Sequence, residues 1–150
     1  MKLEDELKMS TIQNPHHRAS LNIIFTGAWL GDRMNSLLKP FGISEQQYNI
    51  LRILKGQKGA SLNLQDISSR MIHKMSNTTR LVEKLRLKGF VERHICEENR
   101  RKVQISITPS GLKMIETVAV EISNNNADMA SSMTDDEAAQ LAKLLDKIRG

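Results

Sequence analysis

The feature that most constrains the fold is a pair of short amphipathic stretches separated by a tight turn within residues 63–88. The first stretch begins at Asn63, a favourable residue for capping the start of a helix. The second covers about residues 75–88 and is followed by Gly89, which is typical of a helix C-terminus. Inward-facing positions recur at helical spacing in both stretches, namely Ile67 and Met71, then Thr78, Leu81, Val82 and Leu85. The segment therefore predicts two helices joined by a tight turn.

Two segments rich in β-branched residues follow, at residues 90–96 and 102–108, on either side of a polar tip. Their alternating apolar residues predict a β-hairpin. Helices are predicted over residues 15–39 and from Ser44 to Gly56 before this unit, and from Thr108 onward after it. A short helix, a tight turn, a longer helix and a hairpin, in this order, form a winged helix-turn-helix.

The remaining parts of the chain are its two ends. Apolar residues keep helical spacing up to Ile122, and the polar run at residues 123–132 predicts a break or a weak kink. Thr134 and Glu137 form a capping-box pattern that predicts a final helix. Residues 1–14 are predicted to be weakly ordered.

We therefore predict one domain over residues 1–150, mainly α-helical with a small β-wing. Its winged helix-turn-helix core would cover residues 43–107, with helical dimerisation regions at residues 15–39 and 109–150. These flanking helices carry apolar faces that so small a core cannot cover. We expect them to pack against a second copy of the chain in a two-fold homodimer.

The charge of the chain is concentrated in one segment. Residues 70–102 contain ten lysines and arginines against four acidic residues, whereas the whole chain has a net charge of +5. A local excess of this kind is typical of a surface that binds a polyanion, although a solvated basic surface would look the same. An aromatic content of 3% argues against a platform on which single-stranded bases stack.

Several classes of protein are disfavoured by what the sequence lacks. No apolar run reaches the roughly 18 residues of a membrane span, and the charged N-terminus does not resemble a secretory signal. The single cysteine, Cys96, fits a reducing cytoplasm, where we expect the protein to be. No catalytic motif is present, so an enzyme is not expected. No cofactor or metal is predicted either, because the adjacent His16 and His17 lack further ligands.

The second helix of a helix-turn-helix enters the major groove of DNA with its N-terminal residues against the base edges. Short polar side chains suit the groove floor, and Ser76, Asn77 and Thr79 lie at this end of the predicted helix. Arg80, one turn on, can donate to two acceptors of a guanine. Lys74 and Lys84 are better placed for phosphates. Alternatively this is a surface helix in which one of the short residues, Ser76 by preference, only caps the start.

The tip of the predicted hairpin provides a second set of candidate contacts. Arg101 is predicted to enter the minor groove, where the negative potential is enhanced, and Arg100 to contact the flanking phosphate. Asn99 and Lys102 complete this candidate set. Alternatively these are ordinary solvated charges of a turn.

The runs "LQDISSRMIHKMSNTTRLVEKLRLKGFVER" and "ENRRKVQISITPSG" resemble the MarR family of winged-helix regulators. The resemblance implies an obligate cytoplasmic homodimer that represses or activates transcription from a palindromic double-stranded site. By position it assigns recognition-helix contacts to Ser76, Asn77, Thr79 and Arg80, and the minor-groove contact to Arg101. The family usually has an aspartate where this chain has Asn99, so the orientation of Arg101 would be weaker.

The resemblance also implies a small phenolic or lipophilic effector between the dimer helices and the winged domain. Candidate residues for its pocket are His17, Trp29, Arg33 and Met34. Trp29 and Met34 also fit a role in the core, and Cys96 fits a strand residue without a redox role. We therefore predict a DNA-binding regulator, by preference a repressor. The alternative is a winged helix used as a protein-interaction module.

Overall fold

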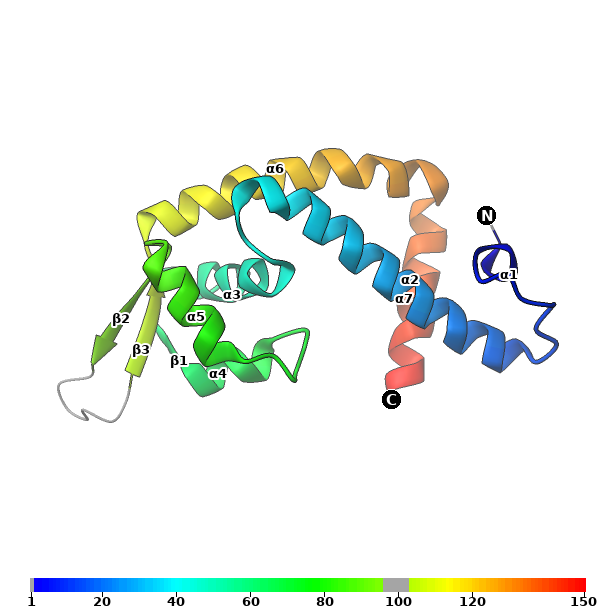
Figure 1. Ribbon diagram of the computed structural model, residues 1–150, viewed down its shortest axis with the longest axis horizontal. Helices are drawn as coiled ribbons and strands as arrows, with labels where there is room; N and C mark the ends of the chain where they lie inside the picture. Colours follow the sequence, from blue (N-terminus) through cyan, green and yellow to red (C-terminus); the bar gives the residue numbers. More distant parts are fainter. Residues whose placement is uncertain (1, 96–102) are drawn as a thin grey trace.

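The chain forms a winged helix-turn-helix unit at one end and an arrangement of longer helices at the other (Figure 1). The structure, a computed structural model, describes residues 2–95 and 103–150, without the side chains of residues 125–130. In chain order the elements are α1 (Leu3–Glu6), α2 (Pro15–Leu38), the 3-10 turn η1 (Lys39–Phe41), α3 (Glu45–Lys55), β1 (Leu62–Asn63), α4 (Leu64–Arg70), α5 (Thr78–Leu87), β2 (Val91–Ile95), β3 (Val103–Ile107), α6 (Pro109–Ser132) and α7 (Asp135–Arg149). The predicted fold class, mainly helical with a small β-wing, is confirmed.

Local hydrogen bonds fix the starts of the helices where the sequence predicts them. Ser44 and Gln47 form a complete capping box at α3, and Thr134 and Glu137 form another at α7. Asn63 accepts a backbone hydrogen bond at the start of α4. Each cap satisfies a backbone N–H group that the first helical turn would otherwise leave without a partner.

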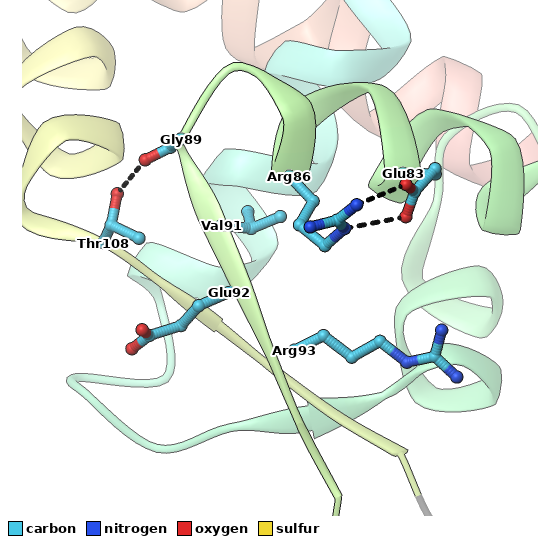
Figure 2. Close-up of a pocket in the computed structure, with 7 residues that line it drawn as sticks. All are labelled: Glu83, Arg86, Gly89, Val91, Glu92, Arg93 and Thr108. Atoms are coloured by element: carbon cyan, nitrogen blue, oxygen red, sulfur yellow. Dashed lines mark hydrogen bonds and ion pairs between the residues drawn. The ribbon is translucent and has the colours of Figure 1, made fainter.

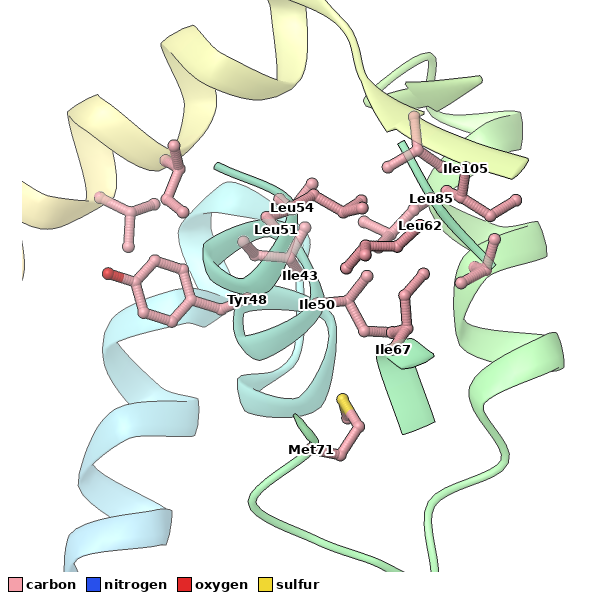
Figure 3. Packing of buried hydrophobic residues seen from close by; sticks show 14 of the residues in the cluster. Ile43, Tyr48, Ile50, Leu51, Leu54, Leu62, Ile67, Met71, Leu85 and Ile105 are labelled. Atoms are coloured by element: carbon pink, nitrogen blue, oxygen red, sulfur yellow. The ribbon is translucent and has the colours of Figure 1, made fainter. Parts of the chain in front are cut away.

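The hydrophobic core is built around α3. Figure 3 shows Ile50, Leu51 and Leu54 of this helix surrounded by side chains from α4, α5 and β3. The most deeply buried large side chains are Leu38, Ile50, Leu51, Leu54, Ile67, Met71, Leu85, Ile105 and Val118. Because Leu85 and Ile105 belong to this core, α5 and the hairpin are held in fixed positions on α3.

The sheet is three-stranded and antiparallel, in the order β1-β3-β2. Val91 of β2 lies opposite Ile107, and Leu62 of β1 lies opposite Ile105. The hairpin is confirmed, whereas β1 was not predicted, because a strand of two residues is too short to show any alternation.

A close contact joins α6 to the entrance of the hairpin. The Thr108 hydroxyl caps α6 by accepting from the Gly111 N–H at 3.1 Å, and it donates to the Gly89 carbonyl at 2.6 Å. The Thr108 N–H donates to the Phe90 carbonyl at 3.1 Å. A Cβ atom on Gly111 would lie only 2.2 Å from that same carbonyl oxygen, so this position has room for glycine alone.

Two predictions for the ends of the chain are wrong. The break expected at residues 123–132 does not occur, because α6 continues to Ser132, while the alternative of a weak kink stays a prediction. Asn, Ser and Asp are only mildly unfavourable inside a helix, and the run contains no proline or glycine. Within the first 14 residues, α1 forms and the Glu4 carboxylate pairs with Arg18 at 2.6 Å. Hydrogen bonding from Arg18 lowers the pKa of Glu4 to about 2.

The long helices expose much apolar surface. α7, all of whose side chains are described, buries none of them, and Leu141, Leu144 and Ile148 are exposed. On α2, Ile24 and Trp29 are exposed as well. No helix in the described parts of the chain is both long and apolar enough to cross a membrane.

Candidate nucleic-acid interface

The turn that leads from α4 to α5 is held by hydrogen bonds to the rest of the domain. The Ile72 N–H donates to the side-chain oxygen of Asn49 at 2.9 Å, and the Ser76 N–H donates to the His73 carbonyl at 3.1 Å. The Lys74 ammonium group donates to the Ser69 carbonyl at 2.5 Å. The start of α5 is therefore presented by an ordered turn.

The residue that caps α5 is Asn77, and the expectation that Ser76 would do so is wrong. The Asn77 side-chain oxygen accepts from the Arg80 N–H at 3.0 Å, and α5 begins at Thr78 rather than near residue 75. The Ser76 hydroxyl is buried and has no hydrogen-bond partner among the described residues. Either residue can cap a helix, and the path of the turn decides which one does.

Because the cap is structural, Asn77→Ala is expected to lower the free energy of unfolding by about 1 kcal/mol. Chemical denaturation followed by circular dichroism measures this change. Asn77→Asp, which keeps an acceptor oxygen in place, is the matched control and should stay within a few tenths of the parent. Equal stability of the alanine variant and the parent would show that the cap contributes nothing.

The outward face of α5 carries three of the predicted contact residues. Thr79, Arg80 and Lys84 are exposed, whereas Thr78, Val82 and Leu85 are buried on the opposite face. Lys74 and Asn77 are exposed at the start of the helix. The fold thus brings Lys74, Asn77, Thr79, Arg80 and Lys84 onto one surface, while the Ser76 hydroxyl is turned inward. Their roles in binding stay predictions.

A pair of arginines between α5 and β2 was not among the predicted contacts. Arg86 donates two hydrogen bonds to the Glu83 carboxylate, at 2.7 and 3.0 Å. These bonds hold the pKa of Glu83 below its ordinary value, and the charges of Arg86 and Arg93 act in the same direction. Figure 2 shows Arg86 and Arg93 along the same groove, which has a volume of about 760 Å³. Helical spacing of Glu83 and Arg86 indicates the ion pair, but only the fold brings Arg93 beside it.

The predicted residues of the hairpin tip, Asn99, Arg100, Arg101 and Lys102, lie outside the described residues, as does Cys96. The strands that lead to the tip are described. On their surface, the Ser106 hydroxyl lies 3.0 Å from His94 Nε2 and donates to Glu92 at 3.2 Å.

The four residues predicted to line an effector pocket all lie on α2, and their role in binding stays a prediction. Trp29 is 50% exposed, so a core role for it is wrong, and the Arg33 guanidinium lies 5.5 Å from its ring centroid. Met34 packs against the core as the alternative expected, and His17 is exposed in the first turn of α2. A groove of about 420 Å³ is lined by Arg33, Ser36, Leu37, Pro40, Phe41 and Glu121, but not by the other three predicted residues.

In the described part of the chain, no three His, Cys, Asp or Glu side chains gather at one place. The candidate interface therefore consists of the cationic face of α5, the ordered turn before this helix, and Arg86 and Arg93 beside it.

Comparison with known proteins gives a consistent set of similarities. Residues 43–103 match the model of the MarR family. The chain is 25% identical over 117 residues to the transcriptional repressor MprA of Escherichia coli K12. The aligned region covers 78% of this chain and 66% of MprA, so this chain spans just under two thirds of that relative.

Solved structures share the fold. A MarR-like transcription regulator from Bacillus cereus superimposes with a TM-score of 0.78 at 19% identity, over 89% of this chain and 95% of that one. The complex of MepR from S. aureus with DNA gives a TM-score of 0.75 at 21% identity, over 86% of this chain and 94% of that one.

Proposed function

Because residues 43–103 match the model of the MarR family, we propose that this chain belongs to that family and is a transcriptional regulator that binds double-stranded DNA sequence-specifically. The observation that carries the proposal is the outward face of α5, where Thr79, Arg80 and Lys84 stand together on a helix fixed to the core by Val82 and Leu85. A helix of this kind fits the major groove of B-form DNA, which is about 12 Å wide.

Within this proposal each cationic group has a distinct task. Arg80 donates to the edge of a guanine, while Lys74 and Lys84 contact phosphates and set the register of the helix in the groove. Arg86 and Arg93 add positive charge between α5 and the wing, facing the backbone of the flanking DNA. The residues of the wing tip, Asn99 to Lys102, would extend this surface to the minor groove.

We further propose that two copies act together on a palindromic operator. The exposed apolar residues of α7 and α2 require a partner surface, and a second copy of the same helices provides one with two-fold symmetry. Residues 15–39 and 109–150 would then form the dimerisation region, and residues 43–107 the DNA-binding core of a single domain.

The regulatory mode belongs to the same proposal. MprA is a repressor. By analogy, this chain would also act as a repressor, and it would do so in the cytoplasm. The groove of about 420 Å³ between α2, η1 and α6 lies where the long helices meet the winged unit, and it suits a small effector that releases the DNA. Arg33 lines it, and the exposed Trp29 ring stacks under the Arg33 guanidinium.

Binding of labelled duplex DNA across a range of salt concentrations tests the proposal. For a dimer with six or more phosphate contacts, affinity is expected to fall about a thousandfold between 50 and 200 mM salt, because each contact releases counterions. Fluorescence anisotropy with the complete chain measures the affinity, and a titration at high DNA concentration should give two chains per duplex.

Lys84→Gln tests one of the proposed phosphate contacts. It should reduce the slope of log affinity against log salt concentration by about one unit per protomer. The rival function, a winged helix that binds only other proteins, predicts weak binding to duplexes that hardly changes with salt. That result would exclude the proposed function.

A further inference from the structure

The most exposed large apolar side chain in the described part of the chain lies at the start of the candidate recognition surface. Met75 is 98% exposed, whereas Met71, four residues earlier in the same turn, is 1% exposed and belongs to the core. A single exposed apolar residue is ordinary on a protein surface. This one lies two residues before the cap of α5, beside the surface proposed to contact DNA.

The turn presents Met75 in a fixed position. Met75 lies between His73 and Ser76, whose backbone groups are joined by a hydrogen bond of 3.1 Å across the turn. The Ile72 N–H is held by Asn49 of α3, and His73 Nε2 lies 3.6 Å from the Glu45 carboxylate. The main chain before Met75 is thus anchored to α3, and the hydrogen bond from Ser76 to His73 closes the turn after it, so little backbone entropy is lost when the side chain finds a partner.

Ile72, earlier in the same turn, is also exposed, but the other residues that flank Met75 are polar or cationic. Lys74 precedes it, and the exposed side chains of Asn77 and Arg80 follow within one turn of α5. An apolar protein partner would have to desolvate these groups without pairing them, which is costly. A polyanion pairs with them instead, and on the floor of the major groove the thymine C5-methyl group is the apolar feature that a methionine can contact.

We propose that Met75 is a specificity-determining residue that packs against the C5-methyl group of one thymine in each half-site. This inference rests on the proposed function, because it requires that α5 enters the major groove. The unbranched, polarizable side chain of methionine suits a contact with a single methyl group. Sequence preference at that position then comes from an apolar contact and not from a hydrogen bond.

The test uses a duplex that the complete protein selects from a random-sequence pool. Each thymine of the selected site is replaced in turn by uracil, which removes the methyl group and keeps every hydrogen-bonding atom. For the parent protein, we expect one thymine in each half-site to be sensitive to this replacement. Replacing that single thymine should weaken binding about fourfold, the effect of losing one buried methyl group. For Met75→Ala the same replacement should have no effect, because the partner is gone.

Two further variants separate this contact from general effects. Met75→Leu, which keeps a large apolar side chain, should retain the sensitivity to uracil. Leu87→Ala removes an exposed apolar residue at the other end of α5 and should leave the sensitivity unchanged. Since Met75 and Leu87 are both largely exposed, none of these variants should alter the melting temperature by much.

Different outcomes would overturn the proposed function and the proposed contact with thymine. Failure to select any duplex overturns the proposed function itself. Selection of a duplex that binds tightly, with uracil tolerated at every position or with the same uracil penalty in Met75→Ala, leaves the proposed function standing and overturns the contact with thymine.

Discussion

Gly111→Ala is expected to lower the free energy of unfolding by about 3 kcal/mol, at the upper end of what overpacking costs. The new Cβ atom would lie 2.2 Å from the Phe90 carbonyl oxygen and 2.8 Å from the Ile107 side chain. The carbonyl belongs to the main chain, so relief requires α6 to move away from the hairpin. That movement would stretch the hydrogen bonds that Thr108 makes to Gly89 and Phe90.

Helix propensity alone predicts the opposite result, because alanine is more favourable than glycine inside a helix by about 1 kcal/mol. Gly31→Ala is therefore the matched control. Its Cβ atom would make only an ordinary contact, 3.6 Å from a carboxylate oxygen of Glu45, so it should stabilise α2 by about 0.5–1 kcal/mol. Denaturant titration of both variants gives the two values. A Gly111→Ala protein as stable as the parent would mean that α6 and the hairpin are not in close contact.

Arg80→Ala is expected to weaken binding to the selected duplex by about 1–3 kcal/mol and to relax the preference for one base pair in each half-site. Arg80 is exposed on the outward face of α5, and only its backbone N–H serves the helix cap. The loss should therefore appear in affinity and specificity, while stability remains that of the parent. Anisotropy titrations against the selected site and single-base variants of it measure both effects.

Arg52→Ala removes an arginine of α3 that is also exposed, and it is the control for the loss of one positive charge. It should change affinity little and leave the base preference intact. If both variants lose the same affinity at every sequence, Arg80 acts only through its charge and does not contact a base edge.

Much of the fold can be predicted because it is encoded locally. The capping boxes at Ser44 and Thr134 and the helical spacing of Leu81, Val82 and Leu85 are all confirmed. These signals depend on residues within one or two helical turns of each other, so a single sequence contains them in full. The resemblance to the MarR family is also confirmed, because the model of that family matches residues 43–103.

The errors occur where the outcome depends on distant parts of the chain. Asn77 rather than Ser76 caps α5 because the turn is anchored through Asn49 of α3, which no local pattern indicates. Arg93 joins the Glu83–Arg86 pair only because β2 packs beside α5. For the surface that would bind DNA, the sequence therefore predicts which residues belong to α5, but not which of their groups are already engaged.

The length of α6 has a mechanical consequence. It is a single helix of 24 residues, hence about 36 Å long, with one end clamped to the hairpin at Thr108 and the other joined to α7. A stiff rod held in this way converts a small rotation into a large displacement, and a tilt of about 5° moves its far end by about 3 Å. A small rotation of α6 at its contact with the hairpin is therefore enlarged along the helix into a change in the distance between α7 and the winged unit.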